Sequence, residues 1–123
     1  MRFERAMIFV VDLERMEAFY RDVLGLTPVE GTRQGDWVEF ETEGGAPFAL
    51  HAIPAQIAAT IQVPSPPIPR EQGSCKLTFA ADDLEAERAR LTGLGVMILD
   101  RPWGDWEVVD PEGNVLGVRA KDS

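Results

Sequence analysis

The sequence has little of two residues on which many site chemistries depend. It contains one cysteine, Cys75, and one histidine, His51, among its 123 residues. A single cysteine excludes an internal disulfide and is typical of a reducing compartment, so we expect a cytoplasmic protein. We interpret Cys75 as a small buried apolar residue rather than a nucleophile. A single histidine leaves few ligands for a transition metal.

Long apolar runs and basic patches are also missing. The longest apolar run, 6–11, is far shorter than the roughly 18 residues of a membrane span, and it is too short for a signal-peptide core. The formal net charge is −9, with acidic residues in excess in both halves of the chain. Such a surface repels nucleic acids and anionic membranes. We therefore expect a small-molecule partner and neither nucleic acid nor a membrane.

What the sequence does contain is an internal repeat of about half its length. Three short matches occur in the same order in both halves of the chain. The number of positions that separates the two members of a match falls by one from each match to the next. They are Asp12-Leu13-Glu14 with Asp83-Leu84-Glu85, Leu24-Gly25 with Leu94-Gly95, and Trp37 with Trp106. A repeat of this length indicates one supersecondary unit used twice. Because a unit of about 60 residues is marginally stable alone, we expect the copies to pack together, with the functional site where they meet.

The first copy has the pattern of a strand, a helix and three further strands. An apolar run over 5–11 precedes Asp12, which is typical of a helix N-cap. Apolar residues then recur at helical spacing as far as Gly25, a C-cap. Extended segments are predicted at 27–30, 37–41 and 48–53.

The second copy repeats this pattern after a proline-rich stretch. It predicts a helix over 84–94, begun by a cap at Asp82/Asp83, and strands over 76–81, 96–99, 106–109 and 115–119. Residues 63–72 hold four of the nine prolines and are interpreted as a stiff, extended linker. We predict one domain over 1–123, with a module at 1–62, the linker at 63–72 and a module at 73–123.

Two βαβββ copies and the turn Asp110-Pro111-Glu112-Gly113-Asn114 before the last strand resemble the vicinal oxygen chelate superfamily. This superfamily includes glyoxalase I, extradiol dioxygenases, and fosfomycin- and bleomycin-resistance proteins. The resemblance covers nearly the whole chain. It implies an α+β fold in which two βαβββ modules form a cupped mixed sheet with the helices outside. It also implies a ligand pocket in the cup and a homodimer.

Enzymes of this superfamily hold one divalent metal ion through His and Glu side chains at four equivalent strand positions. The resemblance places these positions at Arg5, Ala49, Lys76 and Gly117. Metal sites of this kind use imidazole, carboxylate or thiolate, whereas guanidinium and ammonium groups are cationic. We therefore expect no metal and no other cofactor. Ala and Gly would also open space for a ligand.

A small anionic or aromatic ligand is the expected replacement for the metal. Strand residues two apart share a face, so alternate residues, Met7 and Phe9 among them, are predicted to line the cup. Aromatic walls with a few convergent polar groups are typical of small-ligand pockets, and bases there suit a carboxylate, phosphate or enolate-like group. The candidate ligand-binding residues are Arg5, Trp37, Glu39, His51, Lys76, Thr78, Arg119 and Trp106.

Three functions remain open. The first is a metal-free binding protein for a small molecule. The second is a lyase, isomerase or epimerase in which His51, the candidate catalytic residue, is a general base oriented by Glu39, while Arg5 or Lys76 stabilises an oxyanion. A variant of this second function is an enzyme in which His51 and Glu39 hold a metal ion at positions displaced from those of the superfamily. The third is a non-catalytic scaffold in which Arg5 and Lys76 pair internally with Glu39 or Glu107.

Finally, Trp103 is interpreted as either a pocket lid or a dimer contact.

Overall fold

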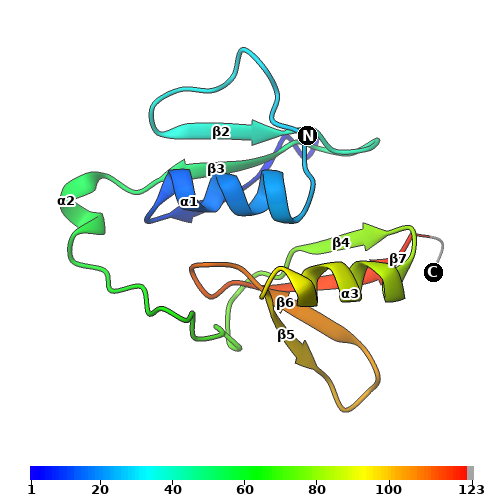
Figure 1. The fold of residues 1–123 in the computed structure, drawn as a ribbon. Coiled ribbons are helices and arrows are strands. Elements are labelled where there is room, and N and C mark those ends of the chain that lie inside the picture. The colour runs from blue at the N-terminus through cyan, green and yellow to red at the C-terminus, as the bar shows by residue number, and fades with distance from the viewer. Residues whose placement is uncertain (122–123) are drawn as a thin grey trace. The chain divides into compact units, whose positions relative to one another are not determined.

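The chain forms two compact units, Met1–Val63 and Pro64–Ser123, and the computed structural model describes residues 1–121 (Figure 1). The first unit contains β1 (Ala6–Val10), α1 (Leu13–Ala18), the π-helical turn η1 (Phe19–Val23), β2 (Trp37–Phe40), β3 (Phe48–Ala52) and α2 (Ala55–Ala58). The second contains β4 (Thr78–Ala81), α3 (Leu84–Gly93), β5 (Met97–Asp100), β6 (Trp106–Val109) and β7 (Val115–Ala120). The expected α+β class with βαβββ-like modules is confirmed.

Each unit has its own mixed sheet, and the three strands of the first sheet correspond in order to β4, β7 and β6 of the second, which has β5 in addition. The strand order is β1-β3-β2 in the first unit and β4-β7-β6-β5 in the second. In both, the first strand runs parallel to the last, with Met7 opposite Ala49 and Thr78 opposite Gly117. Met7 therefore corresponds to Thr78 on the first strands, and Ala49 corresponds to Gly117 on the last strands.

The helices of the two units begin at equivalent aspartates, as the repeat predicted. The side chain of Asp12 accepts a hydrogen bond from the Arg15 amide at 3.1 Å, and that of Asp83 accepts one from the Ala86 amide at 3.1 Å. The helix of the first unit differs from the prediction in one respect, because it widens into η1 after Ala18. The wider turn accompanies burial of two successive aromatic residues, Phe19 and Tyr20.

The segment expected to be extended at 27–30 pairs with β2 at an isolated antiparallel bridge between Pro28 and Phe40, and it does not form a longer strand. The backbone leaves the sheet on either side of this bridge. On one side the Leu26 amide donates to the Tyr20 carbonyl at 2.9 Å. On the other side Gly31, at φ +85°, turns the chain. The corresponding edge of the second unit is β5, a regular strand of four residues.

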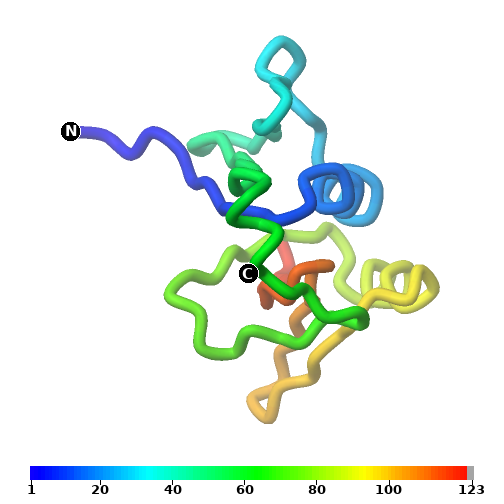
Figure 2. Tube along the Cα trace, turned by 90° about the vertical axis from the view of Figure 1, so that its left-hand side faces the viewer, coloured from blue at the N-terminus to red at the C-terminus, as the bar shows by residue number. Residues whose placement is uncertain are grey.

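Residues 64–72, here called the strap, dock on the second unit (Figure 2). The Arg70 amide donates to the Gly113 carbonyl at 2.8 Å. A Cβ added at Gly113 would lie 2.5 Å from the Ile68 carbonyl oxygen. The proline-rich stretch therefore packs against the turn before β7. The module boundaries at 1–62, 63–72 and 73–123 stay a prediction.

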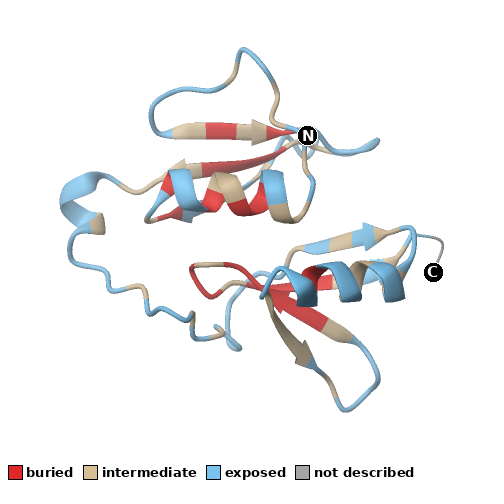
Figure 3. Ribbon diagram, in the orientation of Figure 1, coloured by how far each residue is buried: buried red, intermediate tan, exposed pale blue. Residues whose placement is uncertain are grey.

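Each unit has buried residues of its own (Figure 3), and the kinds of residue that are buried differ between the two units. In the first, the Tyr20 ring lies 5.3 Å from Phe48 and 6.3 Å from Phe40 beneath the helix. In the second, aliphatic residues pack beside three buried acidic residues, Glu107, Asp110 and Glu112. Cys75 is exposed, so the expectation that it is buried is wrong. Within residues 1–121, no helix has the length and apolar character that a membrane crossing requires.

Candidate functional site

The first sheet presents a row of predicted site residues on the face opposite its buried core. Val38 and Phe40 are fully buried, whereas Trp37 and Glu39, which alternate with them on β2, are partly exposed. Trp37 lies opposite His51 on β3. The structure thus brings Trp37, Glu39 and His51 together on one face, as strand alternation predicted.

Arg5, just before β1, pairs with a carboxylate of the same face. Its Nε donates to Glu39 Oε1 at 3.2 Å, and its guanidinium carbon lies 5.0 Å from the centre of the Trp37 ring. The Arg5 side chain is 41% exposed. Within the described residues, its two Nη groups have no hydrogen-bond partner. Arg5 is therefore oriented by Glu39 and Trp37 but retains unused donors.

His51 lies between two aromatic rings and a carboxylate. Its ring centre is 5.4 Å from Trp37 and 5.6 Å from Phe9. Its Nε2 lies 3.2 Å from Asp36 Oδ2. The carboxylate in contact with His51 is therefore that of Asp36 and not that of Glu39, which is instead in contact with Arg5. In the described part of the chain, Nδ1 of His51 has no hydrogen-bond partner.

These side chains surround a hollow of about 490 Å³ in the first unit. Sequence reasoning missed part of its lining, since residues 31–36 belong to no predicted strand or helix. The only signal was the position of Asp36 directly before the strand that bears Trp37. The lining residues are Arg5, Gly31, Thr32, Gln34, Asp36, Trp37, Glu39 and His51.

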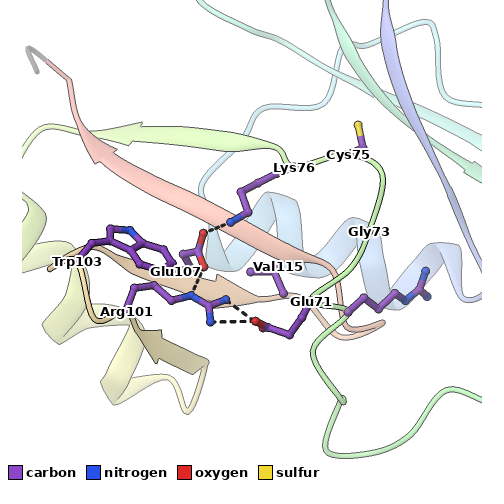
Figure 4. Close-up of a pocket in the computed structure, with 9 residues that line it drawn as sticks. Glu71, Gly73, Cys75, Lys76, Arg101, Trp103, Glu107 and Val115 are labelled. Carbon is purple, nitrogen blue, oxygen red and sulfur yellow. Dashed lines mark hydrogen bonds and ion pairs between the residues drawn. The ribbon is translucent and has the colours of Figure 1, made fainter.

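The second unit contains a chain of four charged side chains (Figure 4). Both Lys76 Nζ and Arg101 Nε contact the Glu107 carboxylate, one at each oxygen. The Nη1 and Nη2 groups of Arg101 donate to the two oxygens of Glu71, each at 3.0 Å. Charges thus alternate along the series Lys76, Glu107, Arg101 and Glu71.

Glu107 is the buried centre of this chain, at 5% exposure. Burial raises the pKa of its carboxyl, but hydrogen bonds and attraction from Lys76 and Arg101 lower the pKa by more. The net result is a pKa below the ordinary 4.5. Hydrogen bonding to Arg101 also lowers the pKa of Glu71, and the two carboxylates raise the pKa of Arg101. Glu71, Arg101 and Glu107 are therefore each held in the charged form.

A smaller hollow, of about 190 Å³, lies beside these ion pairs. Trp103 lines it and is 67% exposed, with its Nε1 donating to Asp105 Oδ2 at 3.0 Å. The pocket-lid and dimer-contact interpretations of Trp103 both stay predictions. Sequence reasoning missed Glu71 and Arg101, because one lies in the presumed linker and the other in a turn. The lining residues are Arg70, Glu71, Gly73, Cys75, Lys76, Arg101, Trp103, Glu107 and Val115.

The ion pairs of the two units are equivalent. Arg5 lies two residues before Met7, and Lys76 lies two residues before Thr78, the residue that corresponds to Met7. Glu39 and Glu107 lie opposite the corresponding pair Ala49 and Gly117. Arg5 and Lys76 are thus each paired with a carboxylate of their own unit, the arrangement anticipated for a scaffold. The hollows beside both pairs leave room for ligands, which a filled scaffold would not.

Three other predicted residues do not join these clusters. Trp106 neighbours Glu107 on β6 and therefore lies on the opposite face, where the guanidinium of Arg88 is 5.7 Å from its ring. The equivalence of Trp37 and Trp106 is wrong, because Trp37 lies two positions before Glu39, whereas Trp106 directly precedes Glu107. Thr78 and Arg119 are exposed on β4 and β7 and line neither hollow.

Gly117 opens no space for a ligand. A Cβ at this position would lie 2.8 Å from Thr78 Oγ1, so the Thr78 side chain already occupies the room. The expectation of space at Gly117 is therefore wrong. At the other small residue, Ala49, the side chain is fully buried.

The residues at the four expected ligand positions do not fit a divalent metal ion. Ala49 and Gly117 carry no donor atoms, and Arg5 and Lys76 are cations engaged by carboxylates. Across residues 1–121, no three side chains of His, Cys, Asp or Glu are grouped so as to hold a metal. No metal-dependent step follows from this arrangement.

Comparisons with known proteins agree with the fold and the repeat. A family model described as a glyoxalase-like domain matches residues 6–118. A lactoylglutathione lyase structure from Agrobacterium tumefaciens is 29% identical, with a TM-score of 0.62 over 98% of this chain and 94% of that one. A protein of unknown function from Agrobacterium tumefaciens str. C58 is 28% identical, with a TM-score of 0.69 and the same two coverages.

A more distant structure shares the fold alone. The antibiotic-binding protein TnmS3 from Streptomyces sp. CB03234 is 23% identical, with a TM-score of 0.62 over 98% of this chain and 97% of that one. A search of curated proteins found no match.

Proposed function

The chain belongs to the glyoxalase-like domain family, and on that premise we propose that it binds a small aromatic molecule in the first unit without a metal ion. The observation that carries this proposal is the hollow of about 490 Å³ beside Trp37 and His51. Its volume lies within the roughly 300–1,000 Å³ of small-molecule sites. Arg5 and Glu39 supply polar groups at its wall. A ligand of one or two rings suits this combination.

The charges around the hollow favour an aromatic ligand over a strongly anionic one. Arg5 is the one cation in the lining, whereas Asp36 and Glu39 are both acidic. An anion would therefore meet two carboxylates for one guanidinium. A neutral ring can stack on Trp37 or His51, as aromatic pairs do, and accept hydrogen bonds from the Nη groups of Arg5.

A ligand screen on the whole chain tests the proposal. Phenol and indole, benzoate, and phenethylamine represent neutral, anionic and cationic aromatic ligands. We expect a neutral or cationic member to stabilise the protein, since a ligand at 100 times its Kd adds about 2.7 kcal/mol to the free energy of unfolding. Its binding should shift the indole N–H resonance of Trp37. If no member stabilises the protein, the scaffold function is favoured instead.

Two tryptophan variants locate the site. Trp37→Leu removes a stacking surface, and aromatic pairs contribute about 0.5–1.5 kcal/mol, so affinity should fall about two- to tenfold. Trp106→Phe is the matched control, because Trp106 lies on the helix-facing side of its sheet and should leave affinity unchanged. Equal losses in both variants would contradict a site at Trp37.

A second candidate function, acid–base catalysis, is favoured by the contact of His51 with Asp36 at 3.2 Å. A carboxylate that orients an imidazole through one nitrogen leaves the other nitrogen as a general base. Such a base would exchange an acidic C–H of a carbonyl compound with solvent deuterium. We expect His51→Gln to slow this exchange about 100-fold or more, and Asp36→Asn to slow it less. No exchange by the unaltered protein would count against this candidate.

The proposal extends to a homodimer in a reducing, cytoplasmic setting. β1 and β4 are edge strands of their sheets, and edges with open hydrogen-bonding groups favour pairing with another chain. Light scattering at micromolar concentration should give twice the chain mass of 13.6 kDa. A mass of one chain would contradict the dimer.

A further inference from the structure

We propose that the second unit has a binding site of its own, which takes small carboxylates through Arg101, and that Glu71 of the strap holds the place of this ligand. The site goes beyond the aromatic site proposed for the first unit. It is formed by the smaller hollow and the ion pairs beside it (Figure 4).

Arg101 is preorganised to bind a carboxylate at both Nη groups. Its Nε contacts the buried carboxylate of Glu107, which fixes the plane of the guanidinium. Its Nη1 and Nη2 point the other way and each donate to an oxygen of Glu71 at 3.0 Å. This parallel two-bond geometry is the one by which arginine recognises carboxylates of ligands. Glu71 therefore occupies the position that a ligand carboxylate would take.

Glu71 is the replaceable carboxylate of the two. Its side chain is 46% exposed, so water can solvate its carboxylate once the carboxylate leaves Arg101. The Glu107 side chain is 7% exposed and contacts Lys76 as well as Arg101. A ligand can thus displace Glu71 while Glu107 stays in place and keeps Arg101 oriented.

The charge around the hollow favours an anionic ligand. Arg70, Lys76 and Arg101 line it, against the carboxylates of Glu71 and Glu107. This surplus of positive charge is local, since the whole chain carries −9. Departure of Glu71 toward solvent would increase the surplus. The first-unit hollow has the opposite balance, so the two hollows should select different ligands.

The size of the hollow and the position of Trp103 indicate a ligand with one ring. The hollow measures about 190 Å³, and an apolar cavity of about 150 Å³ is known to hold benzene. Trp103 lines the hollow and is 67% exposed, so its ring is available for stacking. The guanidinium of Arg101 lies 6.0 Å from that ring. Benzoate, a carboxylate on one ring, is therefore the probe of choice.

The chain also contains a matched control for the arginine. Arg88 binds Asp100 through two bonds, at 2.7 and 3.0 Å, in the same bidentate manner as Arg101 binds Glu71. Arg88 belongs to the lining of neither hollow. Arg88→Lys therefore removes an equivalent two-bond contact at a residue that lines neither hollow.

Benzoate titration of the full chain tests the proposal, by calorimetry and by the indole N–H resonance of Trp103. Glu71→Gln removes the competing carboxylate and should tighten benzoate binding at least fivefold. Arg101→Lys keeps the charge but loses the planar pair of donors, so binding should weaken at least tenfold. Arg88→Lys should bind benzoate like the unaltered protein. Circular dichroism of each variant checks the fold.

Three results would overturn the proposal. They are equal benzoate affinity in the unaltered protein and Arg101→Lys, no tightening in Glu71→Gln, and no binding to Glu71→Gln at millimolar benzoate. Because Glu71 is exposed, the Glu71→Gln variant should fold. It keeps the test decisive even if the Arg101→Lys variant does not fold. Failure here is distinguishable from failure of the first-unit site, which is followed at Trp37 with neutral aromatics.

Discussion

In the first unit, a helix and a sheet enclose aromatic rings, whereas the second unit encloses a carboxylate between two cations. Met16, Phe19 and Tyr20 are buried on the helical segment of the first unit. The helix of the second unit, α3, is largely polar and buries Leu91. The two units thus reach stability by two routes. Apolar burial dominates in the first unit, and in the second a smaller aliphatic core is supplemented by ion pairs and the docked strap.

The equivalent carboxylates show how this difference arises. Glu39 and Glu107 occupy corresponding strand positions, yet their side chains are 15% and 7% exposed. Glu39 contacts Arg5, whereas Glu107 contacts both Lys76 and Arg101. The second cation comes from the turn before β6, outside the repeated positions. A loop residue, and not a repeated strand position, therefore makes the charges around Glu107 differ from those around Glu39.

The largest expected difference between the units concerns the glycines in their hairpin turns. Gly113 has φ +93°, and a Cβ there would meet the Ile68 carbonyl oxygen at 2.5 Å. Gly113→Ala should therefore cost about 3 kcal/mol or more, from backbone strain and from a clash that displaces the strap. Gly44, at φ +64°, has nothing within 4 Å, so Gly44→Ala should cost about 1–2 kcal/mol. Urea unfolding measures both values, and equal losses would show that the strap is not docked.

Removing the equivalent carboxylates should have the next largest effect. Glu107→Gln leaves Lys76 and Arg101 without their shared partner, and hydrogen bonds to charged groups contribute about 1.5–3 kcal/mol. We expect a loss of about 2 kcal/mol. Glu39→Gln affects one partly exposed pair and should cost less than about 1 kcal/mol. A larger loss for Glu39→Gln, measured by chemical unfolding at neutral pH, would reverse the comparison.

Acid should weaken the second unit through the same carboxylate. The pKa of Glu107 is lower in the folded protein than the ordinary 4.5, so the unfolded chain binds more protons between these two pKa values. The stabilisation is therefore complete above about pH 4.5 and is lost as the pH falls through the folded-state pKa. Thermal unfolding from pH 7 to pH 3 should show a shallower fall in Tm for Glu107→Gln than for the unaltered protein. Identical slopes would contradict this assignment.

The smallest expected effect concerns the edge of the first sheet. The Val29 amide donates to the Glu39 carbonyl at 2.7 Å, and the Glu41 amide donates to the Thr27 carbonyl at 2.8 Å. These bonds flank the bridge of Pro28, whose nitrogen therefore faces away from β2. Pro28→Val removes no ladder bond and should change the free energy of unfolding by less than about 0.5 kcal/mol. A loss above about 1 kcal/mol would mean that the proline itself supports the sheet.

Much of the fold could be predicted because its signals are local. Asp12 and Asp83 cap helices through contacts three residues away, and Gly25 and Gly95 adopt positive φ as helix ends require. The candidate site was less accessible. Trp106 was assigned to the wrong face because its match with Trp37 is one position out of step with the strand register, and a shift of one position reverses the face.

The sequence by itself determined the repeat, the helix starts and the alternation of the strands, because each depends on residue type and near neighbours. Only the tertiary structure decided which charges pair. Arg5 meets Glu39 across 34 residues, Lys76 meets Glu107 across 31, and Arg101 meets Glu71 across 30. Strand register and the docking of the strap bring these groups together. No local pattern encodes such approaches, because they depend on how each unit closes on itself.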